Sequence, residues 1–443
     1  MNERNIFEAS QYRNWADVFP TIRSDLYFVM DDSWDIPQGA DNNRYMGTAI
    51  LDSTRFPSYL GSPEARLTKL VADLKSRGWK GGGGWIFAGE ADQYGEVEPI
   101  AYWTERVKAA HTAGFVYWKV DWGHQANNVK WREMQTDVGK QYAPNLWIEH
   151  SIQDESVEIS DVFRTYDVEN IMAQAVTISR VADKLKYHPR GSAKGIINCE
   201  DEPYIAAGLG CAIGVMRHPF NGALPDGQQD FAFPPVGRDL KNRLDEVVRG
   251  VRWHRIAEPF SIGGAYEQDT LELTDYWVLK ERETWVDRKV GDTVIGTTPA
   301  RVSRGLPLPD ISHPDAPDRP VVLASLYPNG AVAIATIGRS LGREYITRRE
   351  TVTVQLPDLT APVGIFGDYE TLILAYPQAI KATGLKVMAQ DLAGETPVDI
   401  THKITIDGNR LIIPGALIRE IGLMAASPND VSEPGMVLKA IHN

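Results

Sequence analysis

The sequence predicts an α/β protein, a (β/α)8 TIM barrel followed by a C-terminal antiparallel β-sandwich domain. Short apolar runs alternate with amphipathic segments over the first 260 residues, as in repeated strand–helix units. After about residue 265 the pattern changes to short strands separated by turn signals. We therefore expect a catalytic-type barrel at 1–265, a connecting segment with a proline-rich loop at 266–320, and a β-sandwich at 321–443.

Helices in the first part have clear boundary signals. Ser62 followed by Pro63 is typical of a helix start, since serine caps free amide groups and proline fits the first turn. Gly78 is expected to end that helix. In the same way, Pro99 begins a helix that Gly114 ends. A longer amphipathic helix is expected over 238–258.

The strands expected between these helices are apolar and short. They lie at 26–30, 81–87, 115–120, 145–150, 162–166, 194–198 and 212–216, with a weak one at 6–10. Eight strands would close a barrel, whereas a doubly wound open sheet is the alternative. We prefer the barrel because polar clusters follow several different strands and no G-x-G-x-x-G turn follows the first. The run Gly81–Gly84 lies within a strand, where glycine allows close packing or a bulge.

The C-terminal part has the turn chemistry of antiparallel sheets. Asn329-Gly330 and Asp407-Gly408 each lie between two β-prone runs, which is a strong hairpin signal. The segment 306–320 contains five prolines and reads as a linker or a long ordered loop. The polar segment 264–305 is long for a simple connection, and it could cover a site or meet a second subunit of a homo-oligomer.

Composition restricts the class of partner. The 443 residues carry a net charge of −13, which argues against nucleic acid and against an anionic membrane surface. No apolar run reaches the roughly 20 residues of a membrane helix. Cys199 and Cys211 make neither a disulfide framework nor a metal-binding spacing, and we expect no metal and no cofactor. Because no signal core opens the sequence, we expect a cytoplasmic protein, or a secreted or periplasmic one if a leader was removed.

The stretch 115–123 is the most informative part of the chain. An aromatic and β-branched run ends there with Lys119 and Asp121, whose side chains point the same way because strand residues alternate. Charged groups at the carboxyl end of a buried parallel strand are the usual position of catalytic groups in a barrel. The positive charge of Lys119 would favour the ionised form of Asp121.

Three other strand ends carry polar clusters that would meet at the same face. They are Asp31, Asp32 and Trp34; Glu149 and His150; and Arg164 with Asp167. Two carboxylates on either side of a bond, one charged and one protonated, are what glycosidic cleavage requires. Aromatic rings such as Trp34, Trp85 or Trp122 suit stacking on a sugar ring.

The order of these motifs resembles that of glycoside hydrolase family 27 and its clan relatives, the α-galactosidases and α-N-acetylgalactosaminidases. The likeness covers roughly residues 26–220. It consists of Asp-Asp-x-Trp at 31–34, an Asp and Arg-Phe-Pro at 52–57, a glycine-rich strand, Lys-x-Asp at 119–121 and Arg-x-x-Asp at 164–167.

This resemblance implies roles for individual residues. Asp121 resembles the nucleophile and Asp167 the general acid/base. Six further residues resemble or adjoin sugar-binding positions: Asp31 and Asp32 for the galactose O4 and O6, Lys119 for O3 and O4, Trp34 as a hydrophobic wall, Arg164 as the sugar-binding arginine, and Asp201 near the site. The implied activity is that of a retaining exo-glycosidase releasing terminal α-D-galactose-like sugars.

The chain also departs from the family pattern. The opening Gly-Trp-Asn-Ser-Trp strand and the disulfides are absent, and the strand at 145–150 ends in Glu149-His150-Ser151 in place of Ser-x-Cys-x-Trp. That region helps to recognise the sugar 2-position in the family. A β-L-arabinopyranoside, an α-N-acetylgalactosaminide or an α-glucoside therefore stays open as the substrate. A barrel that binds carbohydrate without catalysis is the third alternative.

Overall fold

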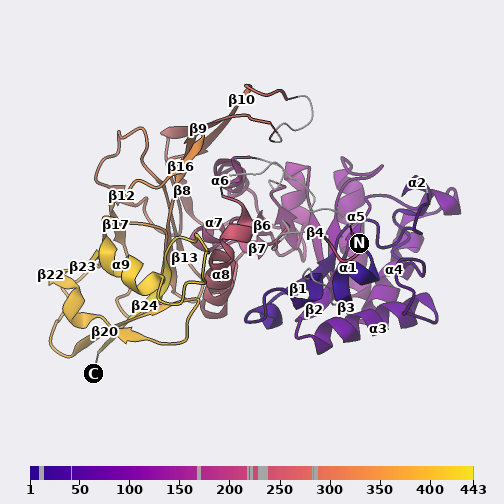
Figure 1. Cartoon of the computed structure of the whole chain (residues 1–443), viewed down its shortest axis with the longest axis horizontal. Helices are drawn as coiled ribbons and strands as arrows, with labels where there is room; N and C mark the ends of the chain where they lie inside the picture. Colours follow the sequence, from indigo (N-terminus) through magenta and orange to yellow (C-terminus); the bar gives the residue numbers. More distant parts are fainter. Residues whose placement is uncertain are drawn as a thin grey trace. The chain divides into compact units, whose positions relative to one another are not determined.

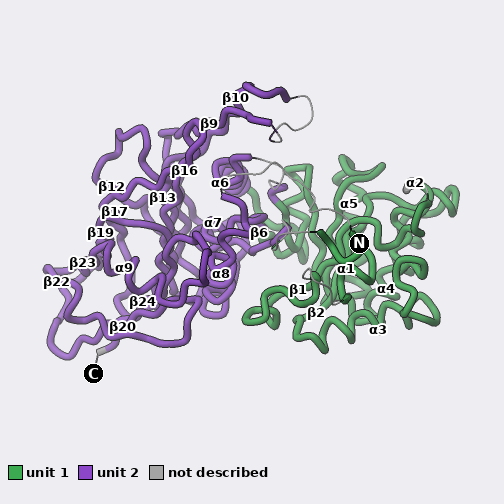
Figure 2. The backbone as a smooth tube through the Cα atoms, viewed as in Figure 1, with its two compact units in different colours: residues 1–164, 187–197, 219–231 green, residues 165–186, 198–218, 232–443 purple. Residues whose placement is uncertain are grey.

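The computed structural model describes residues 1–8, 14–40, 42–166, 171–216, 219, 223–227, 238–281, 283 and 288–442. The chain forms two compact units (Figure 2). Unit 1 comprises 1–164, 187–197 and 219–231, and unit 2 comprises 165–186, 198–218 and 232–443.

The first half of the chain contributes a parallel sheet with strand order β1-β2-β3-β4-β5-β6-β7. Its strands β1, β2, β3 and β4 lie side by side in Figure 1. Its strands are β1 (Tyr27–Met30), β2 (Gly81–Ile86), β3 (Phe115–Val120), β4 (Trp147–His150), β5 (Val162–Arg164), β6 (Ile196–Glu200) and β7 (Ala212–Gly214). This consecutive order without reversal is that of a barrel wall, so the doubly wound alternative is wrong. The described residues form a half-barrel of seven strands, and the predicted closed barrel of eight is not found among them.

The prediction of a strand at 6–10 is wrong for residues 6–8, the part that the structure describes. Residues Glu3–Phe7 form the helix α1, because the Asn2 side chain accepts a hydrogen bond from the Asn5 amide and caps its first turn. The remaining helices are α2 (Asn42–Tyr45), α3 (Pro63–Ser76), α4 (Pro99–Ala113), α5 (Val129–Tyr142), α6 (Ala173–Lys184), α7 (Pro203–Leu209), α8 (Leu244–Ile256) and α9 (Gly415–Gly422).

The capping signals predicted the helix boundaries well. Ser62 caps α3 through the Ala65 amide, and Gly114 ends α4 in the left-handed conformation. The helix expected at 238–258 begins later, at Leu244, after a separate short 3-10 turn. No helix in the described part of the chain is both long enough and apolar enough to cross a bilayer.

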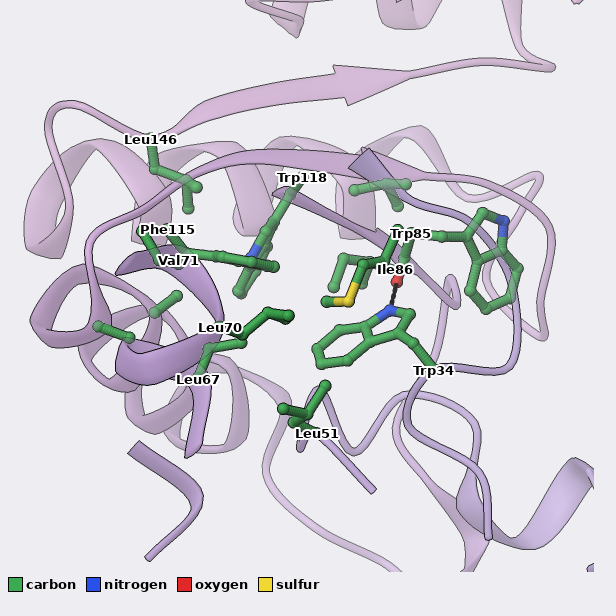
Figure 3. Packing of buried hydrophobic residues seen from close by; sticks show 14 of the residues in the cluster. Trp34, Leu51, Leu67, Leu70, Val71, Trp85, Ile86, Phe115, Trp118 and Leu146 are labelled. Carbon is green, nitrogen blue, oxygen red and sulfur yellow. Dashed lines mark hydrogen bonds between the residues drawn. The ribbon is translucent and has the colours of Figure 1, made fainter. Parts of the chain in front are cut away.

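Buried hydrophobic side chains form the core of unit 1 (Figure 3), and the glycines of β2 let several of them pack closely. Leu74 and Val71 of α3 contact Gly82 from the helix side, and the Trp34 ring lies against Gly84. A Cβ at Gly84 would lie 3.0 Å from that ring, so glycine makes room for it. These contacts bring α3 and the loop after β1 close to β2.

The other two glycines of β2 make room for residues of β3, Val116 and Tyr117. A Cβ at Gly81 would lie 2.6 Å from Val116 and 3.4 Å from the Tyr27 ring. A Cβ at Gly83 would lie 2.5 Å from the carbonyl oxygen of Tyr117. The pairing of β2 with β3 also shifts by one residue between Gly82 and Gly83. The sequence predicted close packing or a bulge for this run; the close packing is confirmed, and the register shift is a bulge or a similar irregularity.

Unit 2 contains three further sheets. Their strand orders are β10-β9-β15-β16, β21-β20-β24-β18-β14-β13-β11-β8 and β12-β17-β19-β23-β22. The strands are β8 (Tyr266–Gln268), β9 (Glu272–Val278), β10 (Thr293–Pro299), β11 (Arg301–Arg304), β12 (Asp310–Ile311), β13 (Val321–Leu326), β14 (Val332–Ile337), β15 (Arg339–Gly342), β16 (Glu344–Ile346), β17 (Thr351–Gln355), β18 (Val363–Phe366), β19 (Thr371–Ala375), β20 (Leu385–Asp391), β21 (Val398–Asp399), β22 (Thr405–Asp407), β23 (Arg410–Pro414) and β24 (Gly435–His442).

One hydrophobic core joins the eight-stranded and the five-stranded sheet. Ile365 and Leu438 contribute from the first sheet, and Val354 and Leu374 from the second. Both predicted hairpins are present, β13–β14 and β22–β23. The pairing is mixed, however, because β11–β13, β14–β18 and β17–β19 are parallel. The two sheets that share this core are compatible with the predicted β-sandwich, but the prediction that its pairing is antiparallel is wrong for these three pairs.

Replacing Gly83 by alanine should destabilise unit 1. The new Cβ would meet the Tyr117 backbone at 2.5 Å, so β2 and β3 would have to separate. We expect a loss of about 1–3 kcal/mol in the free energy of unfolding, measured in urea. Gly264→Ala is the matched control, since a Cβ there meets nothing within 4 Å. Equal stability of the two variants would contradict this account of β2.

Candidate active site

Charged side chains gather on one face of the sheet at the carboxyl ends of β1, β3, β4 and β5. Strand register places Trp85 and Glu149 on either side of Lys119. Side chains in register on parallel strands point the same way, so these three form one row. Asp121 lies two residues beyond Lys119, past the end of the strand.

Asp121 is held at both carboxylate oxygens. Trp85 donates its indole N–H to Oδ2 at 2.9 Å, and the Arg164 guanidinium donates to Oδ1 at 2.7 Å. The side chain of Asp121 is 9% exposed and that of Arg164 is 2% exposed. These contacts fix the orientation of the carboxylate while part of it still reaches solvent.

The electrostatic surroundings keep Asp121 ionised. Burial alone would raise the pKa of this carboxyl, but the positive charges of Arg164 and Lys119 and the hydrogen bond from Trp85 outweigh it. The pKa of Asp121 therefore lies below its ordinary value. An ionised, oriented carboxylate at the end of a parallel strand can act as a nucleophile or as a stabiliser of positive charge.

Asp31 and Lys119 form an ion pair beside Asp121. The Lys119 ammonium donates to Asp31 Oδ1 at 2.8 Å, and the Asp31 side chain is 47% exposed. Desolvation raises the pKa of Asp31, yet the charges of Lys119 and Arg164 bring it below the ordinary value. For Asp32, burial and the negative charge of Asp31 raise the pKa. The half-exposed Asp31 can accept hydrogen bonds from a ligand.

Glu149 lies in the same cluster, and the cluster includes two side chains that the sequence analysis did not assign to the site, Tyr117 and Ser151. The Tyr117 hydroxyl donates to Glu149 Oε2 at 2.7 Å, and Arg164 donates to the Ser151 hydroxyl at 3.0 Å. Arg164 Nε lies 3.8 Å from Glu149 Oε1. Strand alternation from Lys119 back to Tyr117 and from Glu149 on to Ser151 is the signal that identifies both.

His150 lies away from this cluster. The ring is fully buried against α5, where Nδ1 is 3.2 Å from Arg132 and Nε2 is 2.9 Å from the Thr136 hydroxyl. Burial and the Arg132 charge hold the pKa of His150 well below its ordinary value. Alternation along β4 explains the separation, because Glu149 and His150 point to opposite faces.

Arg132 holds the chain around Asp121 from the helix side. This fully buried guanidinium donates to the carbonyl oxygens of Asp121 at 2.7 Å, Ala126 at 2.9 Å and Val120 at 3.3 Å. No sequence motif indicated this role, since Arg132 lies inside an amphipathic helix. It is a positioning residue for the strand end.

Trp34 lies in the hydrophobic core and has no exposed surface (Figure 3). Its indole N–H donates to the Trp85 carbonyl at 2.7 Å. Trp34 therefore holds the backbone of Trp85 and offers no exposed ring face to a sugar, in contrast to the predicted hydrophobic wall. Trp85 is also buried, and its contact with Asp121 is through its N–H edge.

Asp167 and Asp201 are the remaining residues that the sequence predicted for the site. Asp167 lies outside the described residues, so its expected role as acid/base stays a prediction. Asp201 is described in unit 2, where its carboxylate accepts a hydrogen bond from the Met216 amide and its backbone is left-handed with φ 57°. Within the described ranges, no group of three or more His, Cys, Asp or Glu residues is arranged to hold a metal ion.

No family model and no curated protein matches this chain. Three solved structures that resemble it are glycoside-cleaving enzymes by description. An α-galactosidase I from Mortierella vinacea is 12% identical, with 94% of this chain and 86% of that chain covered and a TM-score of 0.38. A family 27 β-L-arabinopyranosidase from Geobacillus stearothermophilus is 13% identical; the match covers 54% of this chain and 63% of that chain, with a TM-score of 0.31. A cyclic α-maltosyl-(1→6)-maltose hydrolase from Arthrobacter globiformis is 13% identical; the match covers 65% of this chain and 88% of that chain, with a TM-score of 0.34.

Asp35 is a buried carboxyl next to the candidate site in sequence. Its Oδ2 accepts hydrogen bonds from the amides of Gly47 at 3.1 Å and Ala49 at 3.2 Å, which ties the turn after β1 to the segment beyond α2. Burial raises the pKa of Asp35 to about 7, although these backbone hydrogen bonds lower it in part.

Replacing Asp35 by asparagine should change how stability depends on pH. The folded pKa lies above the ordinary value of about 3.9, so the unfolded chain releases this proton first. The contribution of Asp35 is therefore full below about pH 4 and is lost as pH rises towards 7. We expect the free energy of unfolding of Asp35→Asn, relative to the unaltered chain, to increase from pH 4 to pH 7. Urea unfolding at several pH values measures it, and a pH-independent difference would contradict the assignment.

Proposed function

We propose that this chain is a retaining exo-glycoside hydrolase that releases terminal α-D-galactose-like sugars. The observation that carries the proposal is the state of Asp121. It is an ionised carboxylate, oriented by Trp85 and Arg164, with the half-exposed Asp31 and its partner Lys119 beside it. This combination suits an attack on an anomeric carbon next to groups that bind sugar hydroxyls.

In the proposed mechanism, Asp121 attacks the anomeric carbon while Asp167 gives its proton to the leaving oxygen. The glycosidic C–O bond breaks as the C–O bond to Asp121 forms. Asp167 then takes a proton from water, which attacks the same carbon and frees Asp121, so the configuration is retained. Each carboxylate oxygen has two lone-pair directions, so the bonds from Trp85 and Arg164 leave Asp121 able to react.

The sugar-binding groups explain the proposed preference for a galactose-like ring. Asp31 accepts hydrogen bonds and Lys119 donates them, and both lie at the same strand-end edge as Asp121. By the resemblance to family 27, Asp31 and Asp32 contact O4 and O6, and Lys119 contacts O3 and O4. Glu149 and Ser151 belong to the segment that corresponds to the family's 2-position loop, and both lie beside Arg164, so they are our candidates for that contact.

The second candidate is a glycosidase for another sugar. The segment 149–154 differs from the family pattern where the 2-position is recognised. Aryl glycosides of α-D-galactose, β-L-arabinopyranose, N-acetyl-α-D-galactosamine and α-D-glucose separate these substrates directly. Galactose binding without turnover of any of the four would favour a carbohydrate-binding protein instead.

Asp121→Asn should abolish turnover of 4-nitrophenyl α-D-galactoside, with a loss of at least about 10³-fold in kcat, because the amide cannot attack. Asp121→Gly with azide should form β-galactosyl azide, since azide then enters from the face that the carboxylate occupied. Near-normal activity of Asp121→Asn would show that the assignment is wrong.

Asp167→Ala should differ from Asp121→Asn in how strongly its activity depends on the leaving group of the substrate. An acid/base variant should retain glycosylation of an activated 2,4-dinitrophenyl galactoside while losing substrates with poor leaving groups. Glu149→Gln is the matched carboxyl variant within the described cluster. If Glu149→Gln shows this leaving-group dependence and Asp167→Ala does not, the acid/base role moves to Glu149.

Arg164→Gln should shift the acid limb of the pH profile of kcat/KM to higher pH. Arg164 is the largest charge that lowers the pKa of Asp121, so its loss raises that pKa. The position of the limb is the readout, because Arg164 can also affect the rate itself. Arg106→Gln is the control, since Arg106 contacts Tyr102 rather than Asp121. An unmoved limb in Arg164→Gln would contradict the electrostatic account.

A further inference from the structure

We propose that Trp122 is the platform of a leaving-group subsite, on which the second sugar ring of a disaccharide stacks. The proposal rests on the proposed glycosidase function and adds to it the class of leaving group. The preferred substrate then carries a pyranose ring, rather than a small alcohol, on the far side of the bond that is cleaved.

The position of Trp122 places it next to the reacting carboxylate. It follows Asp121 directly in the chain, and its ring centroid lies 5.9 Å from that of Trp85. Trp85 in turn donates a hydrogen bond to Asp121. Only one aromatic ring therefore separates the Trp122 ring from the carboxylate.

Trp122 differs from its aromatic neighbours in exposure. It is 41% exposed, whereas Trp85 and Phe87 are each 1% exposed. The buried Phe87 ring supports two exposed rings edge to face: Trp122 at 5.3 Å and 88°, and His124 at 5.1 Å and 89°. A large ring with one packed side and one solvent side is suited to stacking against the apolar C–H face of a sugar.

The loop that carries Trp122 is fixed by backbone contacts. The Trp122 carbonyl accepts from the Ala88 amide at 2.9 Å, and the Ala88 carbonyl accepts from the Gln125 amide at 2.7 Å. Gly123 has φ 153°, and a Cβ there would lie 2.4 Å from the Ala88 oxygen. A platform held in this way loses little conformational entropy when a ligand binds.

Polar groups border the platform. His124 Nε2 lies 3.5 Å from Asp92 Oδ1, and both side chains are more than half exposed. Together they offer a donor and an acceptor to hydroxyl groups at the edge of a stacked ring. An isolated exposed tryptophan needs no functional explanation, but one that is rigid, bordered by polar groups and next to a buried charged carboxylate is better explained by ligand contact.

The geometry favours the leaving group over the terminal sugar. The groups proposed for the terminal sugar come from the row of side chains on β1, β3, β4 and β5. Trp122 lies on the β2 side of these groups, because its ring packs against Trp85 of β2 and against Phe87 in the loop that follows β2. A ring on Trp122 would therefore lie beside Asp121 rather than above Lys119.

Trp122→Ala and Trp122→Phe test the subsite through the leaving group. We expect Trp122→Ala to lower kcat/KM for melibiose, whose leaving group is glucose, by about 10-fold. Turnover of α-D-galactosyl fluoride, which has no leaving-group ring, should stay within about twofold. Trp122→Phe keeps an aromatic face and should restore most of the melibiose activity. Equal losses on both substrates, or no loss on melibiose, would overturn the proposal while leaving the proposed function intact.

Binding provides a second test that does not need turnover. In the Asp121→Asn background, calorimetry should show that Trp122→Ala weakens melibiose about 10-fold and leaves methyl α-D-galactoside unchanged. If the unaltered chain cleaves no galactoside, the proposed function fails, and the same titration still decides the subsite. Equal melibiose affinity with and without Trp122, or no melibiose binding at all, overturns it. Thermal unfolding of each variant checks that the fold is retained.

Discussion

The buried ion pair between Arg164 and Asp121 is the constraint on which the candidate site depends. Removing two charges from water is costly, and a pair of this kind is stable only when its geometry and its other hydrogen bonds are good. Here Trp85 and Ser151 supply those bonds, and Lys119 and Asp31 form a second pair beside the first. The result is a carboxylate that stays ionised in a nearly dry environment, which is where electrostatic interactions are strongest.

Packing behind the sheet makes this arrangement possible. Glycines in β2 let Trp34 and Tyr117 approach the strand closely, and Trp34 then supports Trp85 through a hydrogen bond to its carbonyl. Trp85 is thus held at its backbone by Trp34 as well as at its indole N–H by Asp121. On the same helix-covered side, Arg132 binds the carbonyl groups at the end of β3. The position of one carboxylate is therefore fixed by side-chain contacts from Trp85 and Arg164 and by backbone contacts from Arg132.

Local signals in the sequence predicted much of the fold and part of the site. Ser62, Pro63 and Gly114 act directly on their own helix ends, so their effects could be predicted without knowing the tertiary structure. Alternation along β3 correctly placed Lys119 and Asp121 together. The role of Trp34 was harder to predict, because a tryptophan after a strand can face either a ligand or the core. Its place in the core depends on Gly84, which is distant in the sequence. Arg132 was missed for the same reason, since its three carbonyl partners lie on other elements.

His150 has a consequence for how the protein responds to acid. Its ring stays neutral beside Arg132, whereas in an unfolded chain the same ring takes up a proton as pH falls below about 6.5. Acid therefore favours opening of the contact between β4 and α5 while Asp121, with its lowered pKa, still keeps its charge. Loss of activity in mild acid would then result from opening of the contact between β4 and α5 rather than from protonation of Asp121. Protonation of Asp121 and acid-induced unfolding can be separated here only by measuring activity and folded structure in the same samples at each pH.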